Sequence, residues 1–226
     1  MLDDLRKQVL EAARTAERLD LCQSGGGNFS MIDRASGLVA ITPHDTDRFA
    51  MSWRDVLVVD LDSGDVVEGN PELRPTSESA LHLAIYKARP DVKACAHSHA
   101  AHVCVFAALS MEIKPVLTEA MSYNYKCPLS KFALPSSPEL AQNLVEGLGE
   151  KGLATVMEKH GLMTVSQKDI ADAVRINLYV EKTAECYFRM LQIASKEEVD
   201  RIAIKESQLK DAISYLSASD WREGIE

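Results

Sequence analysis

Residues 91–99 read Asp91-Val-Lys-Ala-Cys-Ala-His-Ser-His99 and follow Pro90, so a short strand is expected to leave a Pro-Asp turn here. Side chains on a strand alternate between its two faces, so His97 and His99 would point to the same side. On a helix the same two residues would lie on nearly opposite sides and could not share a ligand. Two neighbouring imidazoles, with a third from elsewhere and a carboxylate, form the donor set of a catalytic divalent metal, most naturally zinc. Ordinary polar residues at a strand end are the alternative interpretation of an isolated His-x-His pair.

The rest of the chain alternates between strand and helix patterns. Leucines and alanines recur at helical spacing over residues 2–20. Thr76 is expected to cap a helix over residues 77–87, with Glu78 in its first turn. Several strand pairs are joined by tight turns, which predicts an α/β fold whose central sheet is mainly antiparallel and flanked by helices. The expected strands cover residues 29–33, 38–42, 55–60, 65–68, 115–117, 154–157 and 162–165, and the further helices cover 100–109, 138–148, 169–195 and 197–217.

Length and charge restrict the classes of function. The 226 residues suit one domain over 1–226, because no shift in composition divides the chain. A net charge of −9 argues against nucleic-acid binding, since no stripe of Lys and Arg would replace counterions. The same field repels anionic metabolites at long range, so an anion site must be local and built from backbone amides and a few cations. No apolar run approaches membrane-spanning length, and we expect a soluble protein without a membrane partner.

The cysteines indicate a reducing compartment. Their number is odd and no C-x-x-C pair occurs, which is typical of reduced thiols in a cytoplasm. Cys95 lies two residues from His97 on the same side of the expected strand, so it is a weak candidate for a metal ligand. Packing within the sheet explains Cys95 better. The five cysteines are Cys22, Cys95, Cys104, Cys127 and Cys186.

Motifs in a fixed order extend over nearly the whole chain. They are Gly27-Asn28-Phe-Ser30, Ile41-Thr-Pro43, Asp55-Val-Leu-Val-Val-Asp60, Arg74-Pro-Thr-Ser-Glu78-Ser-Ala-Leu-His82, Ile85-Tyr-Lys-Ala-Arg-Pro-Asp91, Ala96-His-Ser-His99 and Lys159-His-Gly161. Together they resemble the class II aldolase/adducin family, in particular its L-fuculose-phosphate aldolase and L-ribulose-5-phosphate 4-epimerase branch. The resemblance implies a three-layer α/β fold with a central antiparallel sheet. It also implies a cyclic homotetramer with active sites at subunit interfaces.

Carried over by position, the resemblance implies that His97, His99 and His160 hold a divalent metal. Zn²⁺ is expected, with Mn²⁺ or Co²⁺ as alternatives, and Glu78 would be the acid/base. Neutral imidazoles leave the ion its charge, and three protein ligands leave positions open for substrate oxygens. Negative charge that develops as a carbon–carbon bond breaks would then be stabilised. An acidic residue at a helix N-terminus is also favoured by the helix dipole alone, which is the structural alternative for Glu78.

Other histidines and tyrosines are weaker candidates. His82 and His102 stay outside the metal set, because each could orient a ligand or be an ordinary packed or capping histidine. Family members use a tyrosine from a neighbouring subunit or from a C-terminal segment for protonation. Tyr123, Tyr125 and Tyr215 are the candidates in this chain, and Tyr123 and Tyr215 are taken as catalytic residues. Each could instead be an interface or core ring with its hydroxyl at the surface.

Phosphate binding is expected at three segments, of which one departs from the family pattern. Backbone amides of a glycine loop and of a helix start form an anion site by geometry. After the Thr-Pro strand end, His44-Asp45 stand where the family has a small hydroxyl residue and a glycine. The change removes close backbone approach and adds a carboxylate that repels a dianion, although a protonated His44 would compensate in part. The expected binding residues are Gly27, Asn28, Thr42, Thr76 and Ser77.

These motifs favour a metal-dependent lyase that cleaves a ketose by a reversible retro-aldol reaction. The ketose is expected to be a 1-phosphate, which would give dihydroxyacetone phosphate and an aldehyde. Because His44-Asp45 depart from the family pattern, an unphosphorylated or carboxylated substrate is the alternative. One alternative is a pentulose-5-phosphate 4-epimerase, and another is a dehydratase or decarboxylase on the same metal scaffold. A non-catalytic interaction scaffold like the adducin head is a further alternative. It is remote, because such a scaffold would not require three histidines and Glu78 together.

Overall fold

The structure is a computed structural model that describes residues 2–205, 207–208 and 211. An eight-stranded sheet forms its centre, in the order β4-β3-β2-β1-β5-β8-β7-β6. Neighbouring strands are antiparallel, except that β6 runs parallel to β7. The predicted mainly antiparallel sheet is thus confirmed. The strands are β1 (Asn28–Asp33), β2 (Leu38–Ile41), β3 (Leu57–Asp60), β4 (Val66–Glu68), β5 (Ala94–Ser98), β6 (Leu129–Ser130), β7 (Ala154–Met157) and β8 (Gly161–Ser166).

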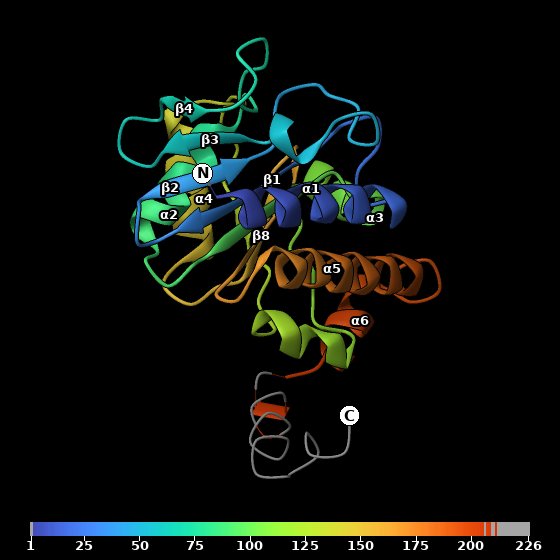
Figure 1. The fold of residues 1–226 in the computed structure, drawn as a ribbon. Helices are drawn as coiled ribbons and strands as arrows, with labels where there is room; N and C mark the ends of the chain where they lie inside the picture. Colours follow the sequence, from blue (N-terminus) through green and yellow to red (C-terminus); the bar gives the residue numbers. More distant parts are fainter. Residues whose placement is uncertain (1, 206, 209–210, 212–226) are drawn as a thin grey trace, which may run out of the picture.

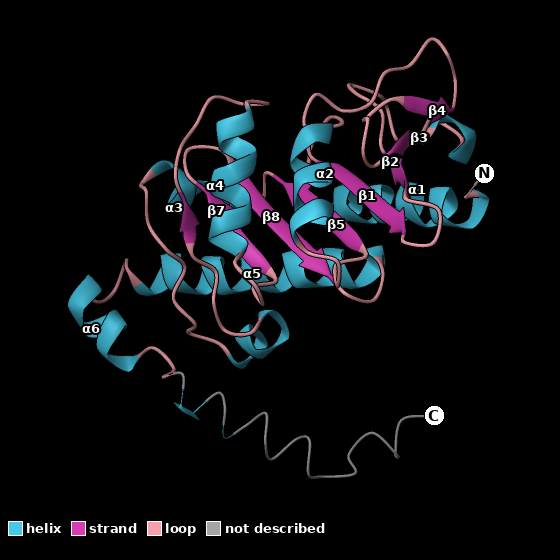
Figure 2. Ribbon diagram, turned by 90° about the vertical axis from the view of Figure 1, so that its left-hand side faces the viewer, coloured by secondary structure: helices cyan, strands magenta, loops and turns pink. Residues whose placement is uncertain are grey.

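Helices cover both faces of the sheet, as the fold prediction required (Figure 1). One core cluster joins the sheet to α1, α3 and α5, and a second joins it to α2 and α4. Figure 2 shows α2 and α4 on one side of the strands, with the long α5 running along the other. No helix among the described residues has both the length and the apolar character that a membrane crossing needs. The helices are α1 (Asp3–Arg18), α2 (Ser79–Ala88), α3 (Ala101–Ala108), α4 (Pro138–Leu148), α5 (Ile170–Met190) and α6 (Lys196–Ile202), with 3-10 turns η1 (Trp53–Asp55) and η2 (Thr118–Tyr123).

Strand β5 is central because it pairs with β1 on one edge and with β8 on the other. The register places Asn28 of β1 and Met163 of β8 directly opposite His97. Alternation along β5 sends Ala94 and Ala96 into the core beneath α5, while Cys95 packs on the α2 and α4 side. Cys95 is therefore a packing residue, which agrees with the preferred sequence interpretation.

Helix α2 begins later than predicted. Thr76 N donates to Thr42 O at 3.2 Å, and Pro43 pairs with Pro75 as an isolated antiparallel bridge. This extended pairing occupies the residues that were expected to start the helix. Glu78 is consequently the N-cap residue, with φ −101° and ψ 14°, and the first helical residue is Ser79. The prediction of a Thr76 cap with Glu78 in the first turn was wrong.

Three further elements differ from the sequence-based expectation, one of them the predicted helix over 197–217, since α6 ends at Ile202. Residues 115–117 form no strand, and the Pro115 carbonyl accepts a hydrogen bond from Ile204 N instead of a sheet neighbour. The predicted helix over 169–195 ends at Met190, and α6 starts separately. Ser195 explains the break, because its side chain and backbone form a reciprocal capping box with Glu198 that initiates a new helix.

Candidate metal centre and active site

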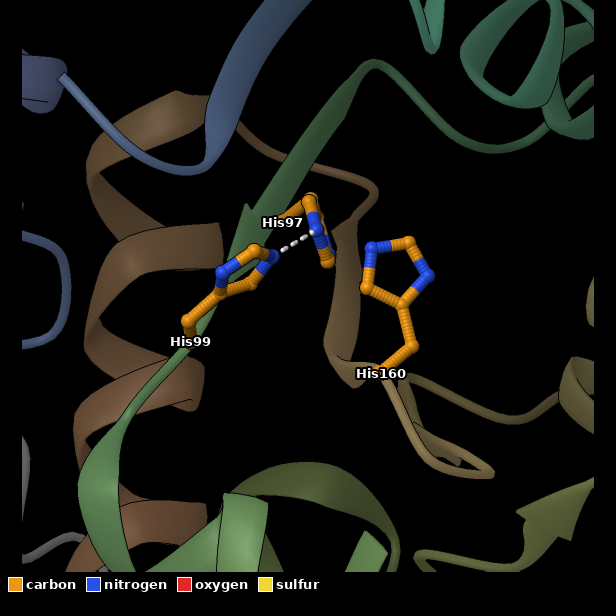
Figure 3. Close-up of side chains that lie close together, drawn as sticks. All are labelled: His97, His99 and His160. Atoms are coloured by element: carbon orange, nitrogen blue, oxygen red, sulfur yellow. Dashed lines mark hydrogen bonds between the residues drawn. The ribbon is translucent and has the colours of Figure 1, made fainter. Parts of the chain in front are cut away.

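Three histidine side chains converge at one end of the central strands. His97 is on β5, His99 follows that strand by one residue, and His160 lies in the turn between β7 and β8. Their ligand nitrogens all lie within 4.8 Å of one another, and His97 Nε2 is 2.9 Å from His99 Nε2 (Figure 3). The structure therefore brings together the three residues that the sequence proposed as metal ligands.

The backbone at Gly161 allows this convergence. A Cβ at Gly161 would lie 2.4 Å from Ser98 O and 3.2 Å from His97 Cε1. Any side chain there would push β8 away from β5 and separate His160 from the other two imidazoles. The glycine is thus required by close approach of two strands rather than by its φ angle.

Hydrogen bonding and burial prepare His97 for a ligand role. Its Nδ1–H donates to Leu162 O at 2.9 Å, which leaves Nε2 with a free lone pair directed at His99. Burial lowers the pKa of His97 to about 3, so the ring is neutral near pH 7. The neutral imidazole is the form that binds metals, and a carbonyl partner for the second nitrogen fixes its orientation.

Glu78 completes the cluster. Its Oε2 lies 3.2 Å from His97 Nε2, and its Oε1 lies 3.2 Å from His160 Nε2. The residue is only 7% exposed. Burial raises the pKa of Glu78, but the neighbouring His97 and His160 and the Asn28 hydrogen bond outweigh burial, and the net shift is downward. Glu78 is therefore a carboxylate near pH 7.

The donor set fits a divalent cation. An ionised carboxylate and an unprotonated His97 Nε2 present lone pairs to the same point, and neither has a proton to share with the other. Glu78 Oε1 is buried without a hydrogen-bond partner among the described residues. Because buried acceptors normally have a partner, this orphaned oxygen indicates a group that the site would bind, either a cation or a substrate proton. Three imidazoles with one carboxylate suit zinc and also suit other first-row divalent ions.

A buried chain of hydrogen bonds leads away from Glu78. Asn28 Nδ2 donates to Glu78 Oε2 at 2.9 Å, and Asn28 Oδ1 lies 2.5 Å from His82 Nε2. His82 Nδ1 lies 2.7 Å from Ser30 Oγ, which lies 2.7 Å from the Tyr86 hydroxyl. All five residues are buried, and burial lowers the pKa of His82 to about 4. Sequence reasoning left His82 unassigned and missed Ser30 and Tyr86.

A cleft of about 260 Å³ opens beside Glu78 and His99. It joins the glycine loop, the segment after β2 and the start of α2, which are far apart in sequence. Of the five predicted phosphate ligands, only Thr42 is not in its lining. Thr42 is buried, and its hydroxyl accepts from Phe29 N at 3.1 Å, so it fixes β1 to β2. The lining residues are Gln23, Ser24, Gly25, Gly26, Gly27, Asn28, Pro43, His44, Asp45, Thr76, Ser77, Glu78 and His99.

Arg48 shapes the glycine loop from beneath. This buried guanidinium donates from Nη2 to the carbonyls of Gly25, Gly26 and Gly27, at 3.0, 2.5 and 2.8 Å. Gly25 and Gly27 have φ angles of +76° and +71°. Three carbonyls gathered on one cation, with alternating left-handed glycines, produce the kind of concave amide arrangement that binds anions. Sequence analysis did not assign this role to Arg48.

Gly27→Ala is expected to destabilise the fold by about 2–4 kcal/mol, from left-handed strain and overpacking together. A Cβ at Gly27 would lie 2.5 Å from His97 O and 2.6 Å from Cys22 Sγ. Gly37→Ala is the matched control, because Gly37 has the same φ of +71° with nothing within 4 Å. The control should cost only about 1 kcal/mol. Equal losses in urea unfolding of the two variants would show that close approach to β5 is unimportant.

His44 and Asp45 both line the cleft, with Asp45 exposed and His44 half-buried. Asp45 has a φ of 48°, which lies in the left-handed region that glycine adopts most readily. The backbone thus keeps a glycine-like conformation while a carboxylate is added at the anion end of the cleft. At this position the chain thus adds a charged side chain to the cleft on a residue whose φ glycine also adopts.

Among the described residues, the cleft lining contains neither Tyr123 nor Tyr125. Tyr123, the last residue of η2, is 1% exposed and belongs to the core cluster that contains α5, where burial raises its pKa well above the usual range. A hydroxyl in this position cannot touch a substrate in the cleft, so its catalytic assignment is not supported. Tyr215 lies outside the described residues. Tyr125 is half-buried.

His102 has a separate structural task. Its Nδ1 lies 2.7 Å from Glu181 Oε1, and Glu181 also accepts from the backbone nitrogens of His102 and Val103 at 3.0 Å each. Glu181 thereby satisfies the N-terminal amides of α3. His102 is absent from the group that could hold an ion among the described residues, in agreement with its exclusion from the predicted ligands.

Comparison with known proteins places the chain in a family. The model of the Class II Aldolase and Adducin N-terminal domain matches residues 7–188. A 5-deoxy-D-ribulose 1-phosphate aldolase of Bacillus thuringiensis serovar kurstaki is 28% identical over 91% of this chain and 96% of its own. An L-ribulose-5-phosphate 4-epimerase of Salmonella paratyphi C is 34% identical over 81% of this chain and 84% of its own. A solved L-fuculose 1-phosphate aldolase superposes with a TM-score of 0.77 and 28% identity, over 88% of this chain and 94% of that one. With a family match over most of its length and aldolase and epimerase relatives, this chain is an enzyme of the class II aldolase and adducin family.

Proposed function

We propose that the chain is a metal-dependent lyase that cleaves a ketose 1-phosphate reversibly into dihydroxyacetone phosphate and an aldehyde. The observation that carries the proposal is the convergence of three histidine nitrogens and Glu78, of which His99 and Glu78 line a cleft that also contains an anion-type glycine loop. The Bacillus relative and the solved fuculose 1-phosphate aldolase, both 28% identical, are named for 1-phosphate substrates, which supports the substrate class.

Different residues are proposed to bind the metal ion and the phosphate group. We assign His97, His99 and His160 to holding the ion, which when bound would polarise the ketose carbonyl and the neighbouring hydroxyl and stabilise negative charge. The glycine loop with Gly27, together with Thr76 and Ser77, would bind the phosphate through amides and hydroxyls. The loop would contribute its backbone amides, because its carbonyls already accept hydrogen bonds from Arg48.

Cleavage requires two proton movements, which balance without any further reactant. The C4 hydroxyl loses its proton as its oxygen becomes the aldehyde carbonyl, and the electron pair of the C3–C4 bond passes to C3. In synthesis Glu78, as a carboxylate with the orphaned Oε1 facing the cluster, would remove the proton from C3, and in cleavage the protonated form of Glu78 would return a proton to C3. The C4 hydroxyl proton is proposed to pass through the hydroxyl of Tyr215 to water, and the protonated Glu78 that cleavage needs gains its proton from water in turn; Tyr123 is buried in the core.

A second candidate function is a pentulose-5-phosphate 4-epimerase. It is favoured by the 34% identity with an L-ribulose-5-phosphate 4-epimerase over 81% of this chain. The same bond would break, the aldehyde would rotate, and the bond would form again. Free aldehyde separates the two functions, because an epimerase retains the fragment that an aldolase releases.

Several finer assignments belong to the same proposal. Zn²⁺ is the proposed ion, with Mn²⁺ or Co²⁺ as alternatives, and the protein is proposed to form a homotetramer with active sites at its interfaces. We also propose one domain over residues 1–226. A cytoplasmic location is supported by the five cysteines, all of which are unpaired.

The proposal is tested by turnover on matched ketoses with and without a 1-phosphate, scoring aldehyde release and epimer formation together. The metal-loaded protein is expected to release aldehyde from the phosphorylated member of the pair and to prefer it. In Asp45→Gly, which removes a repulsive carboxylate while suiting the left-handed backbone, KM for the phosphorylated ketose should fall. Cleavage of only unphosphorylated ketoses would refute the 1-phosphate assignment, and epimer formation without aldehyde would favour the epimerase.

A further inference from the structure

The hydrogen-bonded chain behind Glu78 has a defined direction. An ionised carboxylate can only accept hydrogen bonds, so the amide atom of Asn28 that faces Glu78 Oε2 must be the donor Nδ2. The opposite amide orientation would place an oxygen of Asn28 against the carboxylate. Asn28 Oδ1 therefore faces His82, and the negative charge of Glu78 determines this orientation of the amide.

The direction continues to the far end of the chain. Because Asn28 Oδ1 accepts, His82 must carry its proton on Nε2, and its Nδ1 is left as an acceptor. Ser30 Oγ then donates to His82 Nδ1 and accepts from the Tyr86 hydroxyl. Each of the four hydrogen bonds has one donor and one acceptor when His82 is neutral, which agrees with its lowered pKa.

This chain has two consequences for the site. Asn28 Oδ1 is occupied by His82 and one of the two Nδ2–H groups by Glu78, so the side chain keeps a single N–H that can donate to a phosphate. Anion binding by the Asn28 side chain is thereby limited to that one N–H, which narrows the role predicted for it. The two oxygens of Glu78 are also unequal, because Oε2 is held by Asn28 while Oε1 has no hydrogen bond among the described residues.

We propose that His82 is a positioning residue, which through Asn28 anchors Glu78 Oε2 and thereby leaves Oε1 as the oxygen that exchanges a proton with the substrate. This inference rests on the proposed acid/base role of Glu78. Ser30 and Tyr86 support it by holding His82 in the tautomer with the proton on Nε2. The side chain of His82 is fully buried and is not a metal ligand, so it would act without touching substrate.

The tautomer of His82 is the direct test. The zinc-loaded full chain, labelled with 15N in histidine, is examined by NMR, and the His82 signals are assigned by their loss in His82→Gln. A protonated Nε2 with an unprotonated Nδ1 is expected. A proton on Nδ1, or on both nitrogens, would overturn the inference, because Asn28 would then have to turn its NH₂ toward His82. This readout does not depend on turnover.

Kinetics of two His82 variants provide the second test. His82→Leu should lower kcat by about 10–100-fold, the usual cost of losing an orienting partner, with KM and metal stoichiometry little changed. His82→Gln can place a donor near the former Nε2 and should recover part of the loss. An unchanged kcat in His82→Leu, alongside an inactive Glu78→Gln, would refute the positioning role alone. Activity in Glu78→Gln would instead refute the acid/base role on which it rests.

Discussion

His97→Ala is expected to abolish both bound metal and turnover. His97 is the fully buried member of the ligand set, and its ring is oriented by Leu162 O. Metal polarisation of a carbonyl supplies several kcal/mol, so a loss of about 4 kcal/mol corresponds to a fall in kcat of at least about 10³-fold. Metal content by plasma mass spectrometry and aldehyde release measure the two effects separately.

His102→Ala is the matched control for this change. It removes a different histidine, which is partly buried, is paired with Glu181 and lies just beyond the same strand. The control is expected to cost some stability through the start of α3 but to retain metal. A His97→Ala protein that keeps a full complement of metal and full activity would contradict the assigned centre, whereas metal loss in both variants would indicate general destabilisation.

Glu78→Gln is expected to retain metal and to lose turnover by about 10²–10⁴-fold, the range attributed to general acid/base catalysis. The amide is nearly isosteric, and its oxygen can still accept from Asn28 Nδ2. The variant loses only the charge and the ability to move a proton at Oε1. Steady-state kinetics, metal analysis and exchange of the C3 proton of dihydroxyacetone phosphate with deuterated water measure the outcome.

Glu78→Asp serves as the comparison, because it keeps the charge but withdraws the carboxylate by one methylene. It should exchange the C3 proton slowly, whereas Glu78→Gln should not exchange it at all. Wild-type exchange in Glu78→Gln would remove the acid/base role. Retained metal with no chemistry in Glu78→Gln also argues against a purely structural carboxylate at the N-cap of α2.

Patterns among neighbouring residues predicted one part of the site, and the other part depends on contacts between distant segments. The His97–His99 pair was predicted from strand alternation, which needs only neighbouring residues, although β5 itself ends at Ser98. His160 could be assigned only through the family resemblance, since nothing local connects the β7–β8 turn with β5. The start of α2 was misplaced because Pro75 pairs with Pro43, a contact between distant segments that overrides helix capping.

The roles of His82 and Arg48 could not be predicted from the chain alone. His82 is one helical turn after Glu78, which suggested proximity, but its partners Asn28 and Ser30 precede it by more than fifty residues. Arg48 stabilises three glycine carbonyls on a loop more than twenty residues earlier. Such roles depend on which strands become neighbours, and β1 beside β5 is known only once the sheet has formed.

The three proposed ligands differ in exposure, and this sets how long an ion would stay. His97 lies on a strand with no free edge and has no exposed surface, while His160 is half-buried and His99 is exposed at the cleft. A chelator therefore meets His99 and His160 first and reaches His97 last. The residence time of the ion is governed by the order in which its ligands release it at the mouth of the cleft, so bulky chelators should strip the protein more slowly than small ones of equal affinity.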